Sequence, residues 1–206
     1  MASHADYLVW IDCEMTGLDV EIDELVEVAV VITNYDLVPV DEGMTIVIKP
    51  SEAALDNMGE FVTAMHTSSG LIEEMPHGVS LSEAEATVSN YIRQHVPNPR
   101  TAPMAGNTIG TDRTFLAKYM PSVDTHLHYR SVDVSSIKEL SKRWFPRVYF
   151  NAPSKDGGHR ALADILESIR ELDYYRKAVF VGEPGPTTEQ VQAISADVVD
   201  GFASRL

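Results

Sequence analysis

The stretch Tyr7-Leu8-Val9-Trp10-Ile11-Asp12-Cys13-Glu14-Met15-Thr16-Gly17-Leu18-Asp19 decides the fold of this chain. Its apolar start, residues 7–11, predicts a buried strand, and its Thr-Gly pair predicts a turn. Because side chains alternate between the two faces of a strand, Asp12 and Glu14 project from one face and Cys13 from the other. Two such carboxylates repel each other unless a cation lies between them, and hard oxygen ligands suit Mg²⁺ or Mn²⁺. An Asp-x-Glu pair alone is more often a solvated strand end, so a metal site needs support from motifs elsewhere in the chain.

Apolar, β-branched segments predict four more strands. Short polar turns join the first three strands, which favours an antiparallel meander. Helices and strands alternate after the meander, so we expect an α/β fold with a mixed five-stranded sheet flanked by helices. The four further strands are expected at residues 25–32, 44–48, 102–107 and 128–133.

Turn residues and caps divide the rest of the chain into helices. Residues 51–75 are expected to be helical but broken at Met58-Gly59 and at Ser68-Ser69-Gly70, and Ser80 with Glu83 forms a capping pattern for a helix over 81–96. The basic, aromatic segment 146–158 is expected to be a loop. Further helices are expected from residue 111 or 112 to 119, over 135–145, from His159 to 179 and, after a linker at 182–186, over 187–204. We therefore expect one domain over residues 1–182 and a helical tail over 183–206.

Composition and charge limit the kind of ligand. The chain of 206 residues can bury one substantial core, and its formal net charge is −15. Residues 100–160 carry ten Lys or Arg and five Asp or Glu, a local charge of +5, so the remainder carries −20. A field of this sign repels a long polyanion, whereas a local basic strip suits a small anion. The strip could also be a chance run of solvated charge.

The compartment expected from the sequence is the cytoplasm. No apolar run reaches the ~18 residues of a membrane span, and the first residues lack a signal-peptide pattern. The single cysteine, Cys13, excludes intrachain disulfides and fits a reducing compartment. Core packing is its expected role.

Two downstream motifs support a metal site. Asp112 follows a buried strand and a glycine turn at the start of a helix, where its carboxylate either caps that helix or faces a cleft at the strand ends. Asp164 follows His159 by five residues, about 140° around a helix axis, so the two side chains do not share a face. Asp164 can then face the cleft from within the helix, while His159, preceded by Gly157-Gly158, approaches from a loop.

These residue types indicate phosphodiester hydrolysis. Four carboxylates can hold two divalent ions that stabilise the attacking and leaving oxygens of an in-line phosphoryl displacement. Histidine exchanges protons near neutral pH, which suits His159 to take the proton of the attacking water. The four candidate ligands for two Mg²⁺ or Mn²⁺ ions are Asp12, Glu14, Asp112 and Asp164.

The motifs Asp12-x-Glu14, Asn107 to Asp112 and His159 to Asp164 together resemble the signature motifs of the DEDDh 3′→5′ exonucleases, which have an RNase H-like fold. Longer strings at residues 10–19, 106–113, 128–140 and 159–165 resemble one branch of that family, and the resemblance covers about residues 5–180. It implies a homodimer that releases 5′-mononucleotides from the 3′ end of very short RNAs, dinucleotides above all. It assigns metal binding to the four carboxylates and the general base to His159.

The same resemblance implies a set of substrate contacts. Leu18 matches a wedge between two bases, and Tyr129 matches an aromatic side chain that stacks from the partner subunit, although it could simply pack in its strand. A cap around the 5′ phosphate is matched by His66, Thr108, Arg130 and Ser135. Arg130 suits bidentate phosphate contact, and the hydroxyls can donate further hydrogen bonds.

Two positions depart from the pattern of this branch. Thr108 stands where serine is usual, and Phe61 stands where tryptophan is common, so base stacking is weaker or Phe61 belongs to the core. Two alternative functions stay open on the sequence. One is a general 3′→5′ exonuclease acting on longer RNA or DNA, and the other is a non-catalytic module that binds dinucleotides. The complete set of four carboxylates with His159 favours an enzyme.

Overall fold

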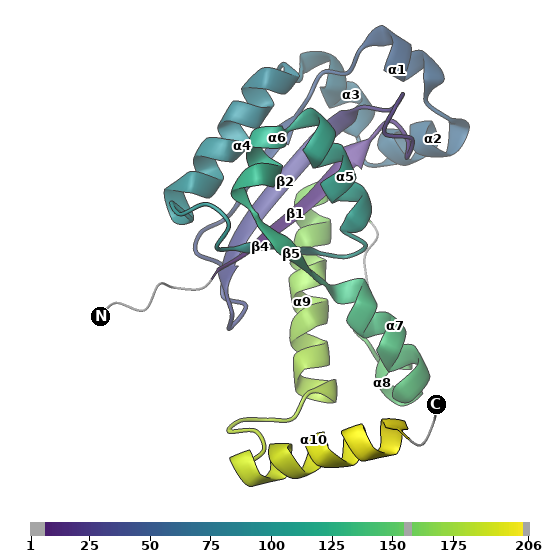
Figure 1. Ribbon diagram of the computed structural model, residues 1–206. Coiled ribbons are helices and arrows are strands. Elements are labelled where there is room, and N and C mark those ends of the chain that lie inside the picture. The colour runs from purple at the N-terminus through teal and green to yellow at the C-terminus, as the bar shows by residue number, and fades with distance from the viewer. Residues whose placement is uncertain (1–6, 155–157, 204–206) are drawn as a thin grey trace.

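The computed structural model describes residues 7–154 and 158–203, and its centre is a mixed five-stranded sheet (Figure 1). The strands are β1 (Tyr7–Met15), β2 (Leu25–Asn34), β3 (Met44–Val47), β4 (Pro103–Gly106) and β5 (His128–Asp133). Their order in the sheet is β3-β2-β1-β4-β5. β1 pairs antiparallel with β2 and β2 with β3, whereas β1 pairs parallel with β4 and β4 with β5. The meander and the mixed sheet predicted from the sequence are confirmed.

The central strand β1 separates two hydrophobic cores. Val9, Ile11 and Cys13 pack into the core on one face, and Leu8 and Trp10 pack into the core on the other. This alternation follows from the two-residue repeat of a strand. Asp12 and Glu14 continue the face of Leu8 and Trp10, so both carboxylates point to the second core. The packing role predicted for Cys13 is confirmed.

Helices cover both faces of the sheet (Figure 1). The first core is closed by α4 (Leu81–His95), α5 (Gly110–Tyr119) and α6 (Pro121–His126), and the second by α7 (Val134–Trp144) and α9 (Ala161–Val179). Ser80 caps α4 by accepting a hydrogen bond from the Glu83 amide at 3.3 Å, as its sequence pattern predicts. The second core therefore lies between β1 and the long helix α9.

The broken helical segment after β3 also follows its sequence. It consists of α1 (Glu52–Asn57), α2 (Glu60–Ser68), α3 (Leu71–Glu74) and a single 3₁₀ turn, Met75–His77. The breaks fall at residues 58–59 and 69–70, and Gly70 has φ 77°, a left-handed conformation that glycine adopts without steric cost. In this way α2 is brought against the end of β1, where the His66 ring contacts Met15.

Three expectations about helix boundaries are wrong. The predicted loop over 146–158 contains a short helix, α8 (Pro146–Phe150), because Pro146 suits a first helical position and the Tyr174 hydroxyl donates to the Val148 carbonyl at 2.8 Å. The rest of that predicted loop includes residues 155–157, which lie outside the described residues. Helix α6 was not expected at all. Helix α9 begins at Ala161 rather than His159, because His159 has a left-handed backbone with φ 48°.

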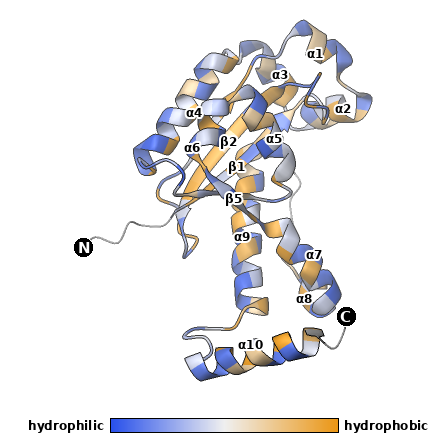
Figure 2. Ribbon diagram, in the orientation of Figure 1, coloured by the Kyte–Doolittle hydropathy of each residue, from blue (hydrophilic) through white to orange (hydrophobic). Residues whose placement is uncertain are grey.

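The last helix, α10 (Thr188–Ala203), lies beyond the end of α9 and away from the sheet (Figure 1). Figure 2 shows apolar residues along it, and Val191, Ile194, Val198 and Phe202 are all exposed. The helix predicted over 187–204 is confirmed as far as the described residues extend. Over residues 7–154 and 158–203, no helix is both long enough and apolar enough to span a membrane.

Candidate active site

Three carboxylates meet where β1 passes beneath the start of α9. Asp12 and Glu14 project from β1, and Asp164 lies in the first turn of α9. One oxygen of each side chain lies within 4.8 Å of the others. Glu14 is buried, and the other two are half-buried, so the group faces a cavity rather than open solvent. Such a set of hard oxygen donors fits a divalent cation.

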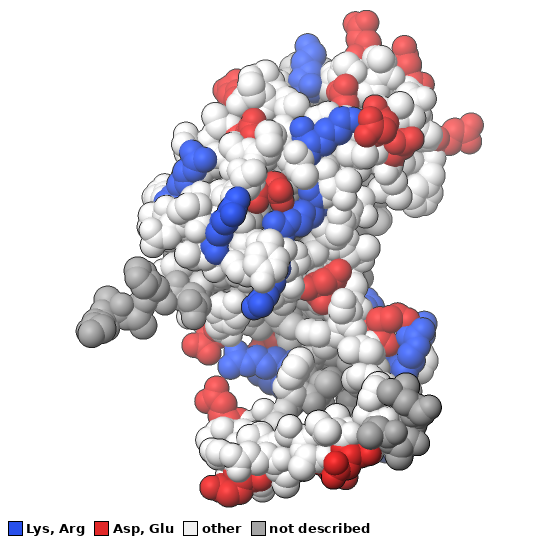
Figure 3. Space-filling model, viewed as in Figure 1, with Lys and Arg blue, Asp and Glu red and all other residues white. Residues whose placement is uncertain are grey.

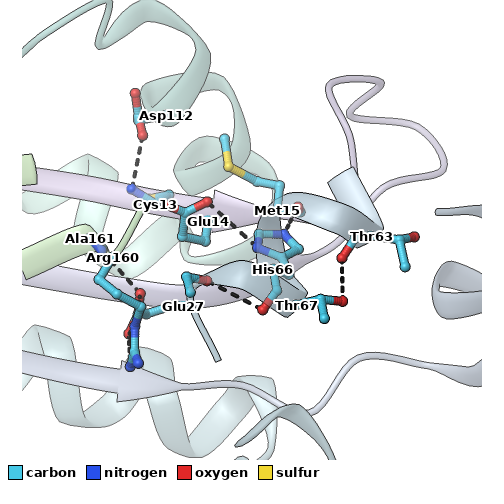
Figure 4. A network of polar contacts seen from close by, with 11 residues as sticks. Cys13, Glu14, Met15, Glu27, Thr63, His66, Thr67, Asp112, Arg160 and Ala161 are labelled. Atoms are coloured by element: carbon cyan, nitrogen blue, oxygen red, sulfur yellow. Dashed lines mark hydrogen bonds and ion pairs between the residues drawn. The ribbon is translucent and has the colours of Figure 1, made fainter. Parts of the chain in front are cut away.

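Asp112 joins this group from the opposite side of the strand. It lies in the first turn of α5, and its Oδ1 accepts a hydrogen bond from the Cys13 amide at 3.0 Å (Figure 4). Ile109 occupies the N-cap position of α5, so Asp112 is not the cap that one interpretation of the sequence allowed. The hydrogen bond instead fixes one carboxylate oxygen to the backbone between Asp12 and Glu14.

A cavity of about 430 Å³ opens over these carboxylates. Leu18 and Phe61 lie at its exposed side, with 80% and 81% of their surfaces accessible, which suits contact with a flat ligand. Thr108 contributes its wall next to β4. The predicted site residues that line this cavity are Asp12, Glu14, Leu18, Phe61, Thr108, Asp112 and Asp164.

The loop that carries Leu18 is closed by a buried aspartate. Asp23 accepts hydrogen bonds from the Thr16 hydroxyl and from the Asp19 amide, both at 2.9 Å. A side chain at Gly17 would overlap the Asp23 carboxylate, because its Cβ would lie 2.3 Å from Oδ2. Glycine is therefore required at the turn that follows β1, and this turn holds Leu18 at the cavity.

Burial and mutual repulsion raise the pKa of the clustered carboxyls. Burial, followed by the charges of Asp112, Asp164 and Glu14, raises the pKa of Asp12 to about 9. Burial and the charge of Asp164 raise the pKa of Glu14 to about 8. Burial raises the pKa of Asp112 to about 6 against the hydrogen bond from Cys13. These acids favour a proton or a cation in the site, which is the behaviour expected of metal ligands.

The other predicted site residues lie around this cavity or apart from it. Tyr129 and Arg130 are exposed on β5, and the Arg130 guanidinium lies 5.5 Å from the Tyr129 ring centroid. The Ser135 hydroxyl lies 3.0 Å from that of Thr108. His159 is exposed two residues before α9 and is not among the described residues that line the cavity. Its role as a base stays a prediction.

His66 occupies a different environment from the one that a phosphate cap suggests. Its ring is fully buried, Nε2 donates to the Met15 carbonyl at 2.8 Å, and Nδ1 lies 4.0 Å from a Glu14 carboxylate oxygen (Figure 4). These contacts tie α2 to the end of β1. The proposed contact of His66 with a phosphate stays a prediction.

Comparison with known proteins agrees with this geometry. A family model described as Exonuclease, RNase_T, matches residues 9–172. An oligoribonuclease from Leifsonia xyli subsp. xyli is 70% identical over 206 residues, which is 100% of both chains. Another, from Streptomyces avermitilis, is 56% identical over 191 residues, 93% of this chain and 96% of that one. This chain belongs to the oligoribonuclease family. It is thus a nuclease hydrolase, and the resemblance found in the motifs is confirmed.

Solved structures outside the oligoribonuclease family share the exonuclease fold. Exonuclease I from Methylocaldum szegediense superposes with a TM-score of 0.59 at 18% identity and covers 84% of this chain. E. coli exonuclease I in complex with a dT13 oligonucleotide gives 0.63 at 14% identity over 83% of this chain. The chain spans 41% of the length of each. At this identity the likeness shows the fold alone, and it confirms the predicted fold class.

In this oligoribonuclease-family chain, the residues that place α9 were not predicted from the sequence. Glu27 of β2 is 1% exposed and accepts hydrogen bonds from the Arg160 guanidinium and from the Ala161 amide at 3.0 Å (Figure 4). Arg160 also contacts Glu74 at 2.8 Å. Glu27 thus anchors the N-terminus of the helix that carries Asp164. The available signal was a single charged residue inside the otherwise apolar run 25–32.

Proposed function

We propose that this chain is a metal-dependent 3′→5′ exoribonuclease that hydrolyses RNA dinucleotides and very short oligoribonucleotides to 5′-mononucleotides. The observation that carries the proposal is the convergence of Asp12, Glu14 and Asp164 within 4.8 Å of one another, beneath a small cavity that Asp112 also lines. A cavity of about 430 Å³ suits a ligand of limited size. The name of the relatives of this chain, oligoribonuclease, supports short RNA as the substrate.

The carboxylates are proposed to hold two Mg²⁺ or Mn²⁺ ions, and the donor set fits because it consists of hard oxygen ligands whose burial and mutual repulsion raise the pKa of Asp12 and Glu14. When bound, such ions would stabilise the charge that develops on the attacking and leaving oxygens. Asp112 is held in place by the Cys13 amide, and Asp164 by the anchored start of α9. His159, which precedes α9, would accept the proton of the attacking water. The chain would thereby supply fixed acidic groups from β1, α5 and α9 and one base from the segment just before α9.

The bases and the 5′ phosphate are proposed to lie on either side of the cavity. Leu18 would separate the two bases and Phe61 would stack on one of them, because both present apolar surface at the opening. Thr108, Ser135, Arg130 and His66 are the proposed contacts of the 5′ phosphate. Lys and Arg side chains gather around α5, α6 and β5, while acidic side chains lie over α1, α2 and α10 (Figure 3). This distribution favours a small anion near β5 and disfavours a long one.

The proposed working unit is a homodimer. β5 is the edge strand of the sheet, and its Tyr129 side chain is 72% exposed with Arg130 beside it. A partner subunit that covers this edge could bring its own copy of this aromatic side chain over the base of the substrate. The proposed compartment is the cytoplasm, since the single cysteine, Cys13, is buried and free.

A competition assay tests the proposed function. The enzyme receives equal amounts of a 5′-phosphorylated RNA dinucleotide and a 5′-phosphorylated RNA of about twenty nucleotides in one tube with Mg²⁺. We expect mononucleotides from the dinucleotide well before the longer RNA shortens. Comparable rates on both would indicate a general 3′→5′ exonuclease. Binding of the dinucleotide without cleavage would indicate a binding module.

Replacing Arg130 with alanine is expected to weaken dinucleotide binding and relax the selection for short RNA. A charge-assisted contact with phosphate accounts for a rise in KM of about 10- to 100-fold, with a smaller change in kcat. The same competition assay measures the preference. Arg147→Ala, an exposed arginine on α8, is the matched control and should behave as the wild type. An unchanged preference in Arg130→Ala would rule out the proposed phosphate cap.

The division into an exonuclease domain, residues 1–182, and a tail, residues 183–206, is also a proposal. The family model ends at residue 172, and the apolar side chains of α10 are exposed rather than packed into either core. We expect removal of residues 183–206 to leave kcat/KM for a dinucleotide within about twofold of the full chain. A loss of more than about tenfold would mean that α10 belongs to the catalytic unit.

A further inference from the structure

One face of α9 connects the acidic cluster to a second polar group. Asp164, Ser168 and Glu171 are spaced four and three residues apart, so they lie above one another on a helix. Asp164 lies at the cavity, while Ser168 and Glu171 are 4% and 5% exposed. Ser168 and Glu171 both accept hydrogen bonds from Asn107, in the loop that follows β4. A single helix therefore carries a candidate metal ligand and two buried polar residues that reach the opposite wall of the cavity.

Asn107 has a fixed orientation between α9 and α7. Its Nδ2 donates to the Ser168 hydroxyl at 2.8 Å and to a Glu171 carboxylate oxygen at 3.2 Å. Its Oδ1 accepts from the Ser135 hydroxyl at 2.9 Å. A carboxylate only accepts hydrogen bonds, so a reversed amide would place two oxygens against each other. Glu171 thus determines that the carbonyl end of Asn107 faces Ser135.

The orientation of Asn107 determines the direction of the hydrogen bond between the hydroxyls of Ser135 and Thr108. Because the single proton of Ser135 goes to Asn107, the hydrogen bond of 3.0 Å between Ser135 and Thr108 has Thr108 as its donor. The Thr108 and Ser135 amides both donate to Asp133, at 3.1 and 2.8 Å. Thr108 has φ 55°, an uncommon conformation for a β-branched residue, and it persists only where neighbours hold it. Asp133 and Ser135 are two of those neighbours, and the Asn107 side chain acts on Thr108 through Ser135.

The charge of Glu171 is compensated on its other side. Lys138 of α7 lies 3.1 Å from its second carboxylate oxygen. A buried carboxylate with both oxygens engaged is a rigid group, which makes it suitable for holding a neighbouring side chain in one orientation. Glu171 is 5% exposed and does not line the cavity, and Asn107 is the cavity-lining residue to which it is hydrogen-bonded.

We infer that Glu171 is a positioning residue that acts through Asn107 to hold the Ser135 and Thr108 hydroxyls in place for the 5′-terminal phosphate of the substrate. This inference rests on the proposed function, because it assumes that a 5′ phosphate binds at these hydroxyls. It connects the proposed binding site of the 5′ phosphate to α9, the helix that carries Asp164. The two ends of a dinucleotide site are thereby held by one rigid element.

Two dinucleotides and three variants test this inference. The substrates are one RNA dinucleotide with a 5′ phosphate and the same dinucleotide with a 5′ hydroxyl. For Glu171→Ala we expect KM for the phosphorylated dinucleotide to rise about tenfold with kcat within about twofold. KM for the 5′-hydroxyl dinucleotide should change less than about twofold. Glu171→Gln keeps an acceptor for Asn107 and should restore most of the affinity. Glu167→Gln is the matched control, a buried glutamate on the same helix that pairs with Arg170 at 3.9 Å.

The outcomes separate this inference from the proposed function. An equal rise of KM for both dinucleotides, or the same rise in Glu167→Gln, would overturn the inference and indicate a general loss of structure. A wild-type enzyme that binds both dinucleotides equally would overturn the proposed phosphate site and this inference with it. A wild-type preference that survives intact in Glu171→Ala would overturn the inference alone. If Glu171→Ala does not fold, Asn107→Ala breaks the same connection from the loop side, and only a KM change confined to the phosphorylated dinucleotide would support it.

Discussion

Replacing Asp12 with asparagine is expected to lower kcat for dinucleotide hydrolysis by about 10³-fold or more, with the fold retained. Asparagine keeps the size of the side chain and one oxygen, but it removes the charge at the centre of the acidic cluster. Burial, together with the charges of four neighbouring acids, Asp112, Asp164, Glu14 and Glu27, raises the pKa of Asp12 to about 9. The release of mononucleotide from a dinucleotide at saturating Mg²⁺ measures the loss.

The same result is expected for Asp164→Asn, because Asp164 shares the cluster from α9. Asp173→Asn is the matched control on that helix: Asp173 is paired with Lys177 and lies away from the cavity lining. It should retain full activity. Without metal, Asp12→Asn should unfold at a temperature no lower than that of the wild type, because asparagine needs neither a proton nor a cation at this buried position. An Asp12→Asn protein that keeps more than about a tenth of its kcat would place the chemistry in another part of the molecule.

Much of the sheet could be predicted because its strands satisfy local rules. The run from Leu25 is apolar on both faces, as expected for a strand buried on both sides, and the polar turns on either side of it allow only short connections. The breaks in the helical segment after β3 lie at glycines and serines that are unfavourable within a helix. Such signals lie within a few residues of the structure that they determine.

The boundaries that were wrong depend on distant residues. The start of α9 is fixed by Glu27, whose carboxylate accepts from the Ala161 amide across 134 positions of sequence. No sequence pattern near His159 contains that information, because it depends on where β2 places Glu27 in the folded chain. Helices α6 and α8 have six and five residues, too short for a helical repeat to be recognised.

The candidate site divides in the same way. The carboxylates of β1 could be predicted to share a face, because strand geometry alone determines it. That Asp164 lies within 4.8 Å of them depends on the Glu27 anchor of α9. The burial of His66 and the contact of Glu171 with Asn107 depend on packing between elements far apart in sequence. Motifs therefore identify the chemical groups, and only the fold shows how they are held.

Removing the metal is expected to make the stability of this protein fall as the pH rises from about 5 to about 9. The pKa of Asp12 is raised from 3.8 to about 9, and that of Glu14 from 4.5 to about 8. Between these values the folded protein holds protons that the unfolded chain has released. Raising the pH therefore favours unfolding, with a slope of about 1.4 kcal/mol per pH unit for each excess proton. The stabilisation is complete below the unfolded pKa values and is lost as the pH passes through 8 to 9.

Saturating Mg²⁺ should flatten this dependence, because a cation replaces the protons as the compensating charge and binds only the folded state. Urea unfolding at pH 5.5, 7.0 and 8.5, in EDTA and in Mg²⁺, measures both slopes. Asp12→Asn provides the internal test, since it removes one of the two carboxyls that titrate above the pKa of Asp112 and should roughly halve the slope in EDTA between pH 7.0 and 8.5. Parallel curves in EDTA and Mg²⁺ would contradict the metal site, whereas a slope in EDTA that Asp12→Asn leaves unchanged would show that other carboxyls hold the excess protons. With the slope present in EDTA, reduced in Asp12→Asn and absent in Mg²⁺, the same carboxylates would account for both the cost of the empty cluster and its affinity for a cation.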